Sequence, residues 1–292
     1  MPPRVHRIAT AELTLVAYEW HPERRGAAPT ILLAHATGFH ARCWVRVVDR
    51  LGARHVVAVD QRGHGGSDKV LPTSWRDFGR DLLQIVRALE LSDILGVGHS
   101  MGGYAVTDAA AAAPQSFRRL ILIDPVIASL ADYHERNAWN PPADVAHPTA
   151  KRRNHWASAR EMFERFRHRV PFSSWNPDVL RDYCEHGLLP DPNGNGYILA
   201  CPPDFEAHIY MTSRSGAGIH DSVRAVQVPV LVVRALGPQA PRDWMDFRAS
   251  PTWPGLARAF PNGRDLYLPD RTHFIPMEDP ELVARLICES DG

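Results

Sequence analysis

A serine in the segment Gly98-His99-Ser100-Met101-Gly102 has the setting that most clearly predicts chemistry in this sequence. A short apolar run precedes it from Ile94, and an Ala-rich run follows it as far as Ala113, so the pattern is strand, sharp turn, helix. In that context Gly-x-Ser-x-Gly is typical of a nucleophile elbow, which exposes a serine hydroxyl beside the positive end of a helix. The flanking glycines are needed because strand and helix nearly touch there. The sequence therefore predicts Ser100 as a catalytic nucleophile.

A serine hydroxyl is a weak nucleophile near pH 7, so it needs a general base, and histidine is the natural choice. Among the 15 histidines of the chain, His273 is the favoured candidate. It lies in a loop between the last expected strand and the terminal helix. Such a loop reaches the carboxyl edge of a parallel sheet, which is also the edge that would carry Ser100.

Two aspartates compete for the position that would orient His273. Asp124 ends an apolar run in Leu122-Ile123-Asp124-Pro125, where a buried carboxylate needs a partner such as a histidine N–H. Asp243 follows the penultimate strand but is displaced from the strand end, and Asp246 is displaced further. The strand-end position favours Asp124 over Asp243. Capping of backbone N–H groups is the structural alternative for Asp124.

The negative charge that develops on a substrate carbonyl during attack needs preorganised N–H donors. The backbone N–H of Met101, directly after the nucleophile, is the expected first donor. The second is expected from the loop after the strand at 30–34, at Thr37, with Ala36 or Gly38 as alternatives.

Histidines in the same loop raise the question of a metal. His35 and His40 have no cluster of carboxylates near them in the sequence, so we expect them to pack the loop rather than to bind a metal.

The elements that must position these residues follow from hydrophobic periodicity. Short apolar runs alternate with helical runs in the first half and again near the end, which is typical of a mostly parallel sheet with helices on both faces. Strands are predicted at 12–20, 30–34, 56–59, 94–97, 120–123, 228–233 and 265–268, and helices at 43–51, 74–89, 104–113, 256–260 and 280–287.

The pattern changes between residues 127 and 226, where prolines, aromatic residues and arginines dominate and strand patterns vanish. We expect a core of residues 1–126 and 227–292, with 127–226 inserted as a mostly helical cap over the strand ends. Short helices are predicted at 160–166 and 177–186. The aromatic residues expected to line the pocket in part are Tyr133, Trp139, Trp156, Phe163, Phe166, Trp175 and Tyr210.

Composition narrows the class of protein. A chain of 292 residues with 45% hydrophobic residues is long enough for one large core with an insertion. Lys+Arg and Asp+Glu balance at 33 each, so no net field would attract nucleic acid or an anionic membrane. The 4 scattered cysteines suggest neither a zinc site nor a disulfide scaffold, and no apolar leader or membrane span is evident. We expect a soluble, cytoplasmic protein.

Four segments make the chain resemble a capped, carboxylesterase-like serine hydrolase of the α/β-hydrolase superfamily. They are residues 35–39, 60–68, 98–103 and 272–274. The resemblance implies the α/β-hydrolase fold, the chain order nucleophile, acid, histidine, and a site between sheet and cap. It also implies that His64 and Asp68 are structural. A serine rather than an aspartate at the elbow argues against the haloalkane dehalogenase and epoxide hydrolase branches.

The combined interpretation is a serine hydrolase that cleaves carboxylic esters of small to medium, largely apolar substrates through an acyl-enzyme. Ser100, His273 and Asp124 would form the triad, and the N–H groups of Met101 and Thr37 would bind the oxyanion. No metal or cofactor is implied, and the expected partner is a small-molecule ester. Two alternatives stay open: the same residues could hydrolyse thioesters, lactones or carbon–carbon bonds, or the fold could serve a ligand-binding receptor with little turnover.

Overall fold

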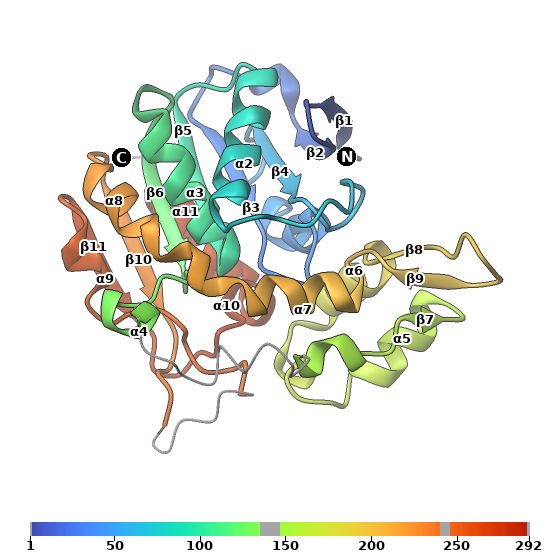
Figure 1. The fold of residues 1–292 in the computed structure, drawn as a ribbon. Coiled ribbons are helices and arrows are strands. Elements are labelled where there is room, and N and C mark those ends of the chain that lie inside the picture. The colour runs from blue at the N-terminus through green and yellow to red at the C-terminus, as the bar shows by residue number, and fades with distance from the viewer. Residues whose placement is uncertain (1, 135–146, 240–245, 291–292) are drawn as a thin grey trace.

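A mostly parallel sheet forms the centre of the computed structural model, which describes residues 2–134, 147–239 and 246–290. The strand order is β1-β2-β4-β3-β5-β6-β10-β11 (Figure 1). Strands from β4 to β11 in this order run parallel, whereas β1 and β2 add an antiparallel pair at one edge. This is the kind of sheet that the alternating strand and helix patterns predicted.

The bounds of the strands agree with the predictions to within a few residues, except that β1 was not predicted. The strands are β1 (Arg4–Ala9), β2 (Thr14–Trp20), β3 (Thr30–Ala34), β4 (Val56–Asp60), β5 (Ile94–His99), β6 (Phe117–Ile123), β10 (Val230–Arg234) and β11 (Gly263–Tyr267). The helices around them are α1 (Val45–Val48), α2 (Arg76–Ala88), α3 (Met101–Ala112), α8 (Ile219–Ala225), α9 (Leu256–Ala259), α10 (Ile275–Glu278) and α11 (Pro280–Glu289). The helix predicted at 43–51 is instead a 3-10 turn followed by the single turn of α1.

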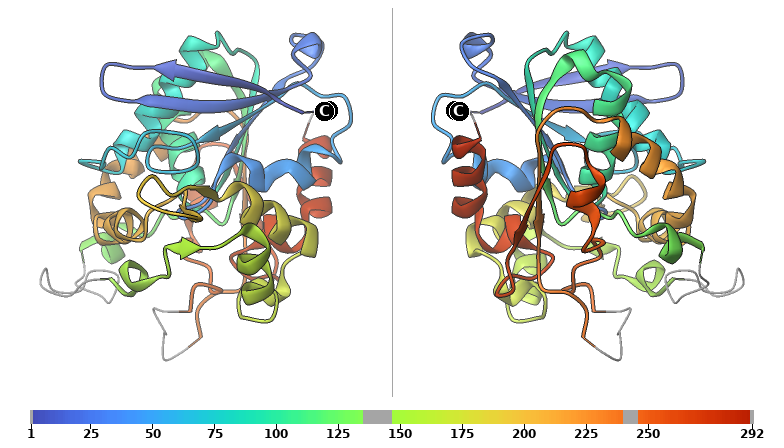
Figure 2. Two further views of the ribbon diagram at one scale, coloured as in Figure 1. Left: turned by 90° about the vertical axis from the view of Figure 1, so that its right-hand side faces the viewer. Right: turned by 90° about the vertical axis from the view of Figure 1, so that its left-hand side faces the viewer.

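Helices cover both faces of the sheet because its central strands are apolar on both sides. In β3, Leu32 and Ala34 face the helices α2 and α3, while Ile31 and Leu33 face α1 and α11. Figure 2 shows this layering, with the red helix α11 on one side of the sheet and the teal and green helices α2 and α3 on the other.

The inserted segment, residues 127–226, contains both helices and short strands. Its elements besides α8 are α4 (Leu130–His134), α5 (Ala159–Phe166), α6 (Pro177–His186), α7 (Pro203–Met211), β7 (His155–Trp156), β8 (Leu188–Pro190) and β9 (Tyr197–Leu199). The three strands form a small antiparallel sheet in the order β7-β9-β8, so the expectation of a strand-free segment was wrong. Strands of two or three residues are too short to show an alternating pattern.

Most of the inserted segment lies beyond the carboxyl ends of the parallel strands, where α5, α6 and α7 are seen below the sheet in Figure 1. The exception is α8, which packs against α3 beside the sheet. An aromatic cluster joins the segment to the sheet edge: the Phe39 ring centroid lies 5.5 Å from that of Trp175 and 5.4 Å from that of Tyr183. In the part of the chain that the structure describes, no helix has the length and apolar character needed to cross a bilayer.

Candidate active site

Ser100 stands at the junction of β5 and α3 in a backbone conformation that non-glycine residues rarely adopt, with φ 56° and ψ −118°. The neighbouring glycines permit this turn. A Cβ atom added to Gly98 would lie 2.3 Å from the carbonyl oxygen of Gly102, and one added to Gly102 would lie 2.2 Å from that of Ala34. The backbone of α3 therefore lies in contact with those of β5 and β3, and Ser100, only 4% exposed, stands at the end of β5.

The structure brings Ser100, His273 and Asp124 into one hydrogen-bonded chain. His273 Nε2 lies 3.0 Å from Ser100 Oγ, and His273 Nδ1 lies 2.6 Å from Asp124 Oδ2. With the proton on Nδ1, the imidazole donates to the carboxylate and its Nε2 accepts from the serine hydroxyl. Asp124 is fully buried, whereas His273 keeps 12% of its side chain exposed. This arrangement can take a proton from the hydroxyl and stabilise the imidazolium that results.

The second oxygen of the Asp124 carboxylate is held by the loop after β10. Oδ1 accepts from the Ala235 N–H at 3.0 Å, from Ser250 Oγ at 2.5 Å and from Thr252 Oγ1 at 3.2 Å. A buried carboxylate needs donors of this kind. Ser250 and Thr252 were not predicted, because no local pattern shows that their loop folds back onto the end of β6.

The competing aspartates are placed differently. Asp243 lies outside the described residues. Asp246 lines the cavity described below, but its Oδ1 lies 2.7 Å from Arg248 Nε. The hydrogen bond from Arg248 lowers the pKa of Asp246 below its usual range.

His99 was noted only as part of the serine motif, yet it contacts the histidine loop. Its Nε2–H donates to the backbone carbonyl of His273 at 2.8 Å. Burial lowers the pKa of His99 well below the usual value, so its imidazole is neutral. The hydrogen bond fixes the backbone from which the His273 side chain extends.

The two predicted N–H donors come from segments whose side chains meet. Met101 is the first residue of α3, so its N–H has no carbonyl partner within the helix. The Thr37 hydroxyl donates to Met101 Sδ at 3.3 Å. The Gly38 N–H, one of the alternatives, donates to His64 Nε2 at 3.0 Å and is therefore engaged.

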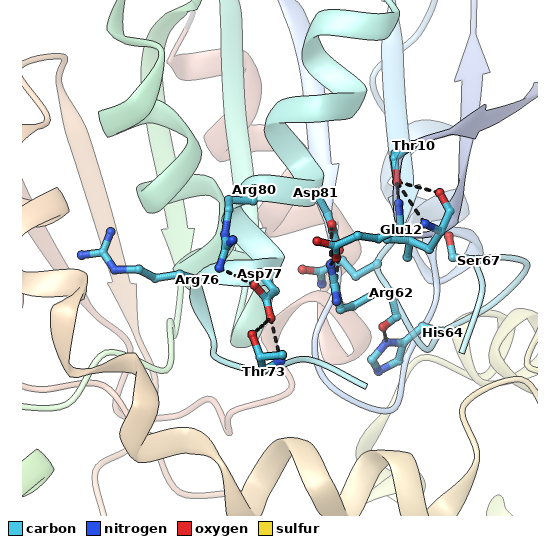
Figure 3. Close-up of polar contacts among 12 residues, drawn as sticks. Thr10, Glu12, Arg62, His64, Ser67, Thr73, Arg76, Asp77, Arg80 and Asp81 are labelled. Atoms are coloured by element: carbon cyan, nitrogen blue, oxygen red, sulfur yellow. Dashed lines mark hydrogen bonds and ion pairs between the residues drawn. The ribbon is translucent and has the colours of Figure 1, made fainter. Parts of the chain in front are cut away.

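His64 holds the loop at Gly38 in place through hydrogen bonds of both its ring nitrogens. Its Nδ1–H donates to the Arg62 carbonyl at 2.8 Å, which leaves Nε2 free to accept from Gly38, and burial lowers its pKa to about 3. Arg62 in turn forms a two-pronged ion pair with Asp81 of α2, at 2.6 and 2.8 Å (Figure 3). The Gly38 loop is thus tied to a helix through buried polar contacts.

The other two histidines near this loop also hold backbone. His35 Nδ1–H donates to the Ala36 carbonyl at 2.7 Å, and its Nε2 accepts from the Gln61 N–H. His40 Nε2–H donates to the Tyr183 carbonyl at 3.1 Å. The Cys43 thiol also lies 3.6 Å from Nε2 and 3.8 Å from Nδ1 of His40. Both histidines therefore hold the backbone of this loop or of the segment packed on it.

A cavity of about 200 Å³ opens beside Ser100 and His273 and reaches Thr37. Apolar side chains form much of its lining: Phe39, Val126, Pro171, Phe172, Trp175, Phe247, Pro251 and Phe274. Of the aromatic residues expected to line the pocket, Trp175 and Tyr210 do so. Four others pack elsewhere, namely Tyr133, Trp156, Phe163 and Phe166, and Trp139 lies outside the described residues.

Four polar residues of the lining contact one another, and we call them the polar cluster: Arg152, Tyr183, Glu206 and Tyr210. Arg152 Nη1 is ion-paired with Glu206 Oε2, and Arg152 Nη2 donates to the Tyr183 hydroxyl at 3.1 Å. The Tyr210 hydroxyl also hydrogen-bonds Glu206. Of these, only Tyr210 was a predicted pocket residue.

Comparison with known proteins matches the chain to one family model and to several individual proteins. A model of the alpha/beta hydrolase family matches residues 31–286. A stretch of 129 residues, 37% of this chain, is 30% identical to the type I acyl-CoA thioesterase mpaH' of Penicillium brevicompactum, but it spans only 30% of that protein. The abhydrolase domain-containing protein ACTT2 of Alternaria alternata is 24% identical over 228 residues, which cover 67% of this chain and 82% of that one.

Among solved structures, E-2-(acetamidomethylene)succinate hydrolase superposes on the chain with a TM-score of 0.71 and 23% identity, covering 98% of each chain. At that identity the likeness shows a shared fold.

Proposed function

The chain belongs to the alpha/beta hydrolase family, and from that membership we propose that it is a serine hydrolase that cleaves carboxylic esters through an acyl-enzyme. The observation that carries the proposal is the hydrogen-bonded chain from Ser100 through His273 to Asp124, which opens onto a largely apolar cavity. The family and the fold agree with the resemblance noted in the sequence.

In the proposed reaction, Ser100 Oγ attacks the ester carbonyl while His273 Nε2 takes its proton. Asp124 stabilises the imidazolium, and the N–H groups of Met101 and Thr37 bind the oxyanion. His273 then gives the proton to the leaving alkoxide, which departs as the alcohol. A water molecule then gives a proton to His273 and attacks the carbonyl of the acyl-enzyme. The acid is released, and His273 returns the proton to Ser100 Oγ, which restores the serine.

We also propose that the parts of 127–226 that lie over the strand ends act as a cap that selects the substrate. They supply 9 of the 22 described residues that line the cavity, among them Phe172, Trp175 and Tyr183. A cavity of about 200 Å³ suits small to medium substrates.

Thioester hydrolysis is the second candidate, since the matched stretch of mpaH' belongs to a protein named as a thioesterase. The same residues could carry out either reaction, because both pass through an acyl-enzyme. Oxygen esters and thioesters of the same acyl chain, compared by kcat/KM, separate the two.

The test is the Ser100→Ala variant, which removes the nucleophile and little volume. The unaltered protein should hydrolyse p-nitrophenyl butyrate and be labelled at a single site by a fluorophosphonate probe. The variant should lose both properties while keeping its circular dichroism spectrum. Ser173→Ala, at an exposed serine of the insertion, is the control that keeps both. Labelling that survives in Ser100→Ala would contradict the proposal, and an unaltered protein that binds esters without turnover would favour the receptor alternative.

A further inference from the structure

The polar cluster is an unusual component of a cavity that is otherwise lined largely by apolar side chains. Replacing a buried ion pair with apolar residues of similar size is often neutral or stabilising, so such a pair is weak evidence for a role in stability. Here the side chain of Glu206 is only 7% exposed, and that of Arg152 is 27% exposed and lines the cavity. The placement of the pair in the lining therefore suggests a role in binding.

The cluster adjoins the loop that we propose to bind the oxyanion. A Cβ atom added to Gly38 would lie 2.7 Å from Glu206 Oε1, and Gly38 has φ +79°, so glycine is favoured there on both counts. Since Thr37 precedes Gly38, a group of the substrate that reaches this cluster lies close to the reacting carbonyl but is distinct from it.

The polar cluster has hydrogen-bonding capacity beyond its internal contacts. Glu206 accepts from both Arg152 and Tyr210, so its contacts lie within the cluster. A guanidinium has five N–H donors, and Arg152 gives one each to Glu206 and Tyr183. The remaining N–H donors of Arg152 are what we expect the cluster to offer to a ligand in the cavity.

The charge of the cluster is balanced when Glu206 is ionised. Burial raises the pKa of Glu206, while the charge of Arg152 and the hydrogen bonds from Arg152 and Tyr210 oppose that rise. Burial opposes the charge on Arg152, but the Glu206 carboxylate and the Tyr183 hydroxyl outweigh it and raise the pKa of Arg152 above its ordinary value. Asp246, the other carboxylate of the lining, has its own partner in Arg248. An anionic ligand at the free donors of Arg152 would lie near Glu206 and be repelled, whereas an uncharged acceptor would not.

Building on the proposed ester hydrolysis, we propose that Arg152 selects substrates that carry an uncharged hydrogen-bond acceptor, a ketone or amide carbonyl, in addition to the ester that is cleaved. The Arg152–Glu206 pair then presents a donor without a net charge. Arg152 acts here as a specificity residue and takes no part in bond breaking.

Substrates matched in length test this selection. The acyl series consists of the ethyl esters of pentanoic acid and 4-oxopentanoic acid and the monoethyl ester of butanedioic acid. The alcohol series consists of pentyl acetate, 4-oxopentyl acetate and 4-acetoxybutanoate. Within each series the three compounds differ only in carrying a methylene, a carbonyl or a carboxylate at the far end, and both products are quantified by chromatography.

We expect the keto compound of at least one series to have a kcat/KM about 10- to 100-fold above that of its alkyl analogue, as for a hydrogen bond to a charged donor. The carboxylate compound should be poorer than the keto compound. In Arg152→Met the ratio of kcat/KM for the keto compound to that for its alkyl analogue should fall to about one. In Glu206→Gln, which leaves Arg152 unbalanced, the carboxylate compound should become the preferred one.

Two further variants test whether the Arg152–Glu206 ion pair has only a structural role, since it also joins the segment after residue 148 to α7. The double variant Arg152→Met/Glu206→Gln removes both charges and leaves no uncompensated ion, and it should still lose the keto preference. Arg153→Met alters the neighbouring arginine, which lies over the Trp156 ring outside the cavity, and it should keep the preference.

An unaltered protein that cleaves all six esters without preferring a keto compound would overturn this inference and leave the proposed function standing. So would Arg152 variants that lose activity equally on every ester. Absence of hydrolysis of any ester, with no difference from Ser100→Ala, would instead count against the proposed function.

Discussion

The Asp124 carboxylate divides its two oxygens between a histidine and a loop. Oδ2 accepts from His273, while Oδ1 accepts from Ala235, Ser250 and Thr252. The backbone of Asp124 also has a positive φ of 45°, a conformation that costs about 1 to 3 kcal/mol in a residue other than glycine. The surrounding contacts compensate for that cost and hold the carboxylate where His273 needs it.

Asp124→Asn separates these two functions. The amide oxygen can still accept from the loop, so we expect a melting temperature within a few degrees of normal. It cannot stabilise an imidazolium, and it favours the wrong imidazole tautomer. In a well-studied Ser-His-Asp protease the corresponding change lowers kcat by about 10⁴, and we expect a loss of that order here.

The comparison variant is Asp243→Asn, which alters the competing aspartate and should leave kcat nearly normal. Steady-state rates of both variants at one pH decide between the two aspartates. Normal activity in Asp124→Asn together with collapse in Asp243→Asn would mean that the acid lies in the loop after β10.

At the scale of elements, prediction from the sequence succeeded where a segment carries its own pattern. The strand β3 was predicted with its observed bounds because all five of its residues are buried and four of them are apolar. The edge strand β1 was missed because its burial alternates only weakly and its residues include Arg4, His6 and Arg7. The strands β7 to β9 were missed because they have only 2, 3 and 3 residues, fewer than the roughly four over which alternation can be recognised.

The same distinction between segments with and without a pattern of their own applies to the residues of the candidate site. Ser100 and His273 were predictable because local motifs mark them, and Asp124 because a carboxylate ends an apolar strand. Arg152, Tyr183 and Glu206 come from separate elements of the insertion, and nothing in their local sequence shows that they meet. Such contacts depend on tertiary packing, which periodicity does not encode.

For Phe172, a residue of the inserted segment, we predict an effect on the preferred length of the substrate. The Phe172 ring lines the cavity and lies with its centroid 4.3 Å from that of Phe166, nearly parallel to it. In Phe172→Ala the cavity should enlarge, so kcat/KM for octanoate esters should rise about 10-fold relative to acetate esters. A series of p-nitrophenyl esters from acetate to decanoate measures the profile.

Phe163→Ala is the matched control, since Phe163 belongs to the same segment but does not line the cavity. Its chain-length profile should equal that of the unaltered protein. An unchanged profile in Phe172→Ala would contradict the role of this segment as a substrate-selecting cap.

Across the whole molecule, buried histidines link stability to pH. Burial lowers the pKa of His40 and of His64 to about 3, and those of His35 and His99 also fall well below the usual value. The unfolded chain binds protons at these residues near pH 6.5, whereas the folded chain does not. Stability is therefore full above about pH 6.5 and declines as the pH falls towards 3, by about 1.4 kcal/mol per pH unit for each histidine.

His40→Gln tests this linkage with one residue. Its amide can donate to the Tyr183 carbonyl as the imidazole does, but it does not titrate. The slope of the free energy of unfolding against pH, measured in urea between pH 6 and 5, should decrease by about 1.4 kcal/mol per pH unit. The exposed His155, replaced by Gln, controls for loss of a surface imidazole. Equal slopes in His40→Gln and the unaltered protein would show that His40 is protonated in the folded state.

The contacts of Asp124 also constrain how such a site can evolve. Ala235 lies at the start of the loop after β10, and Ser250 and Thr252 lie near its end, so one carboxylate fastens both ends of this loop. A descendant that moved its acid into the loop would have to keep an acceptor at position 124, because a residue that cannot accept these hydrogen bonds would release the loop meant to hold the new acid. We expect such a lineage to retain aspartate or asparagine at position 124 while the new carboxylate is acquired.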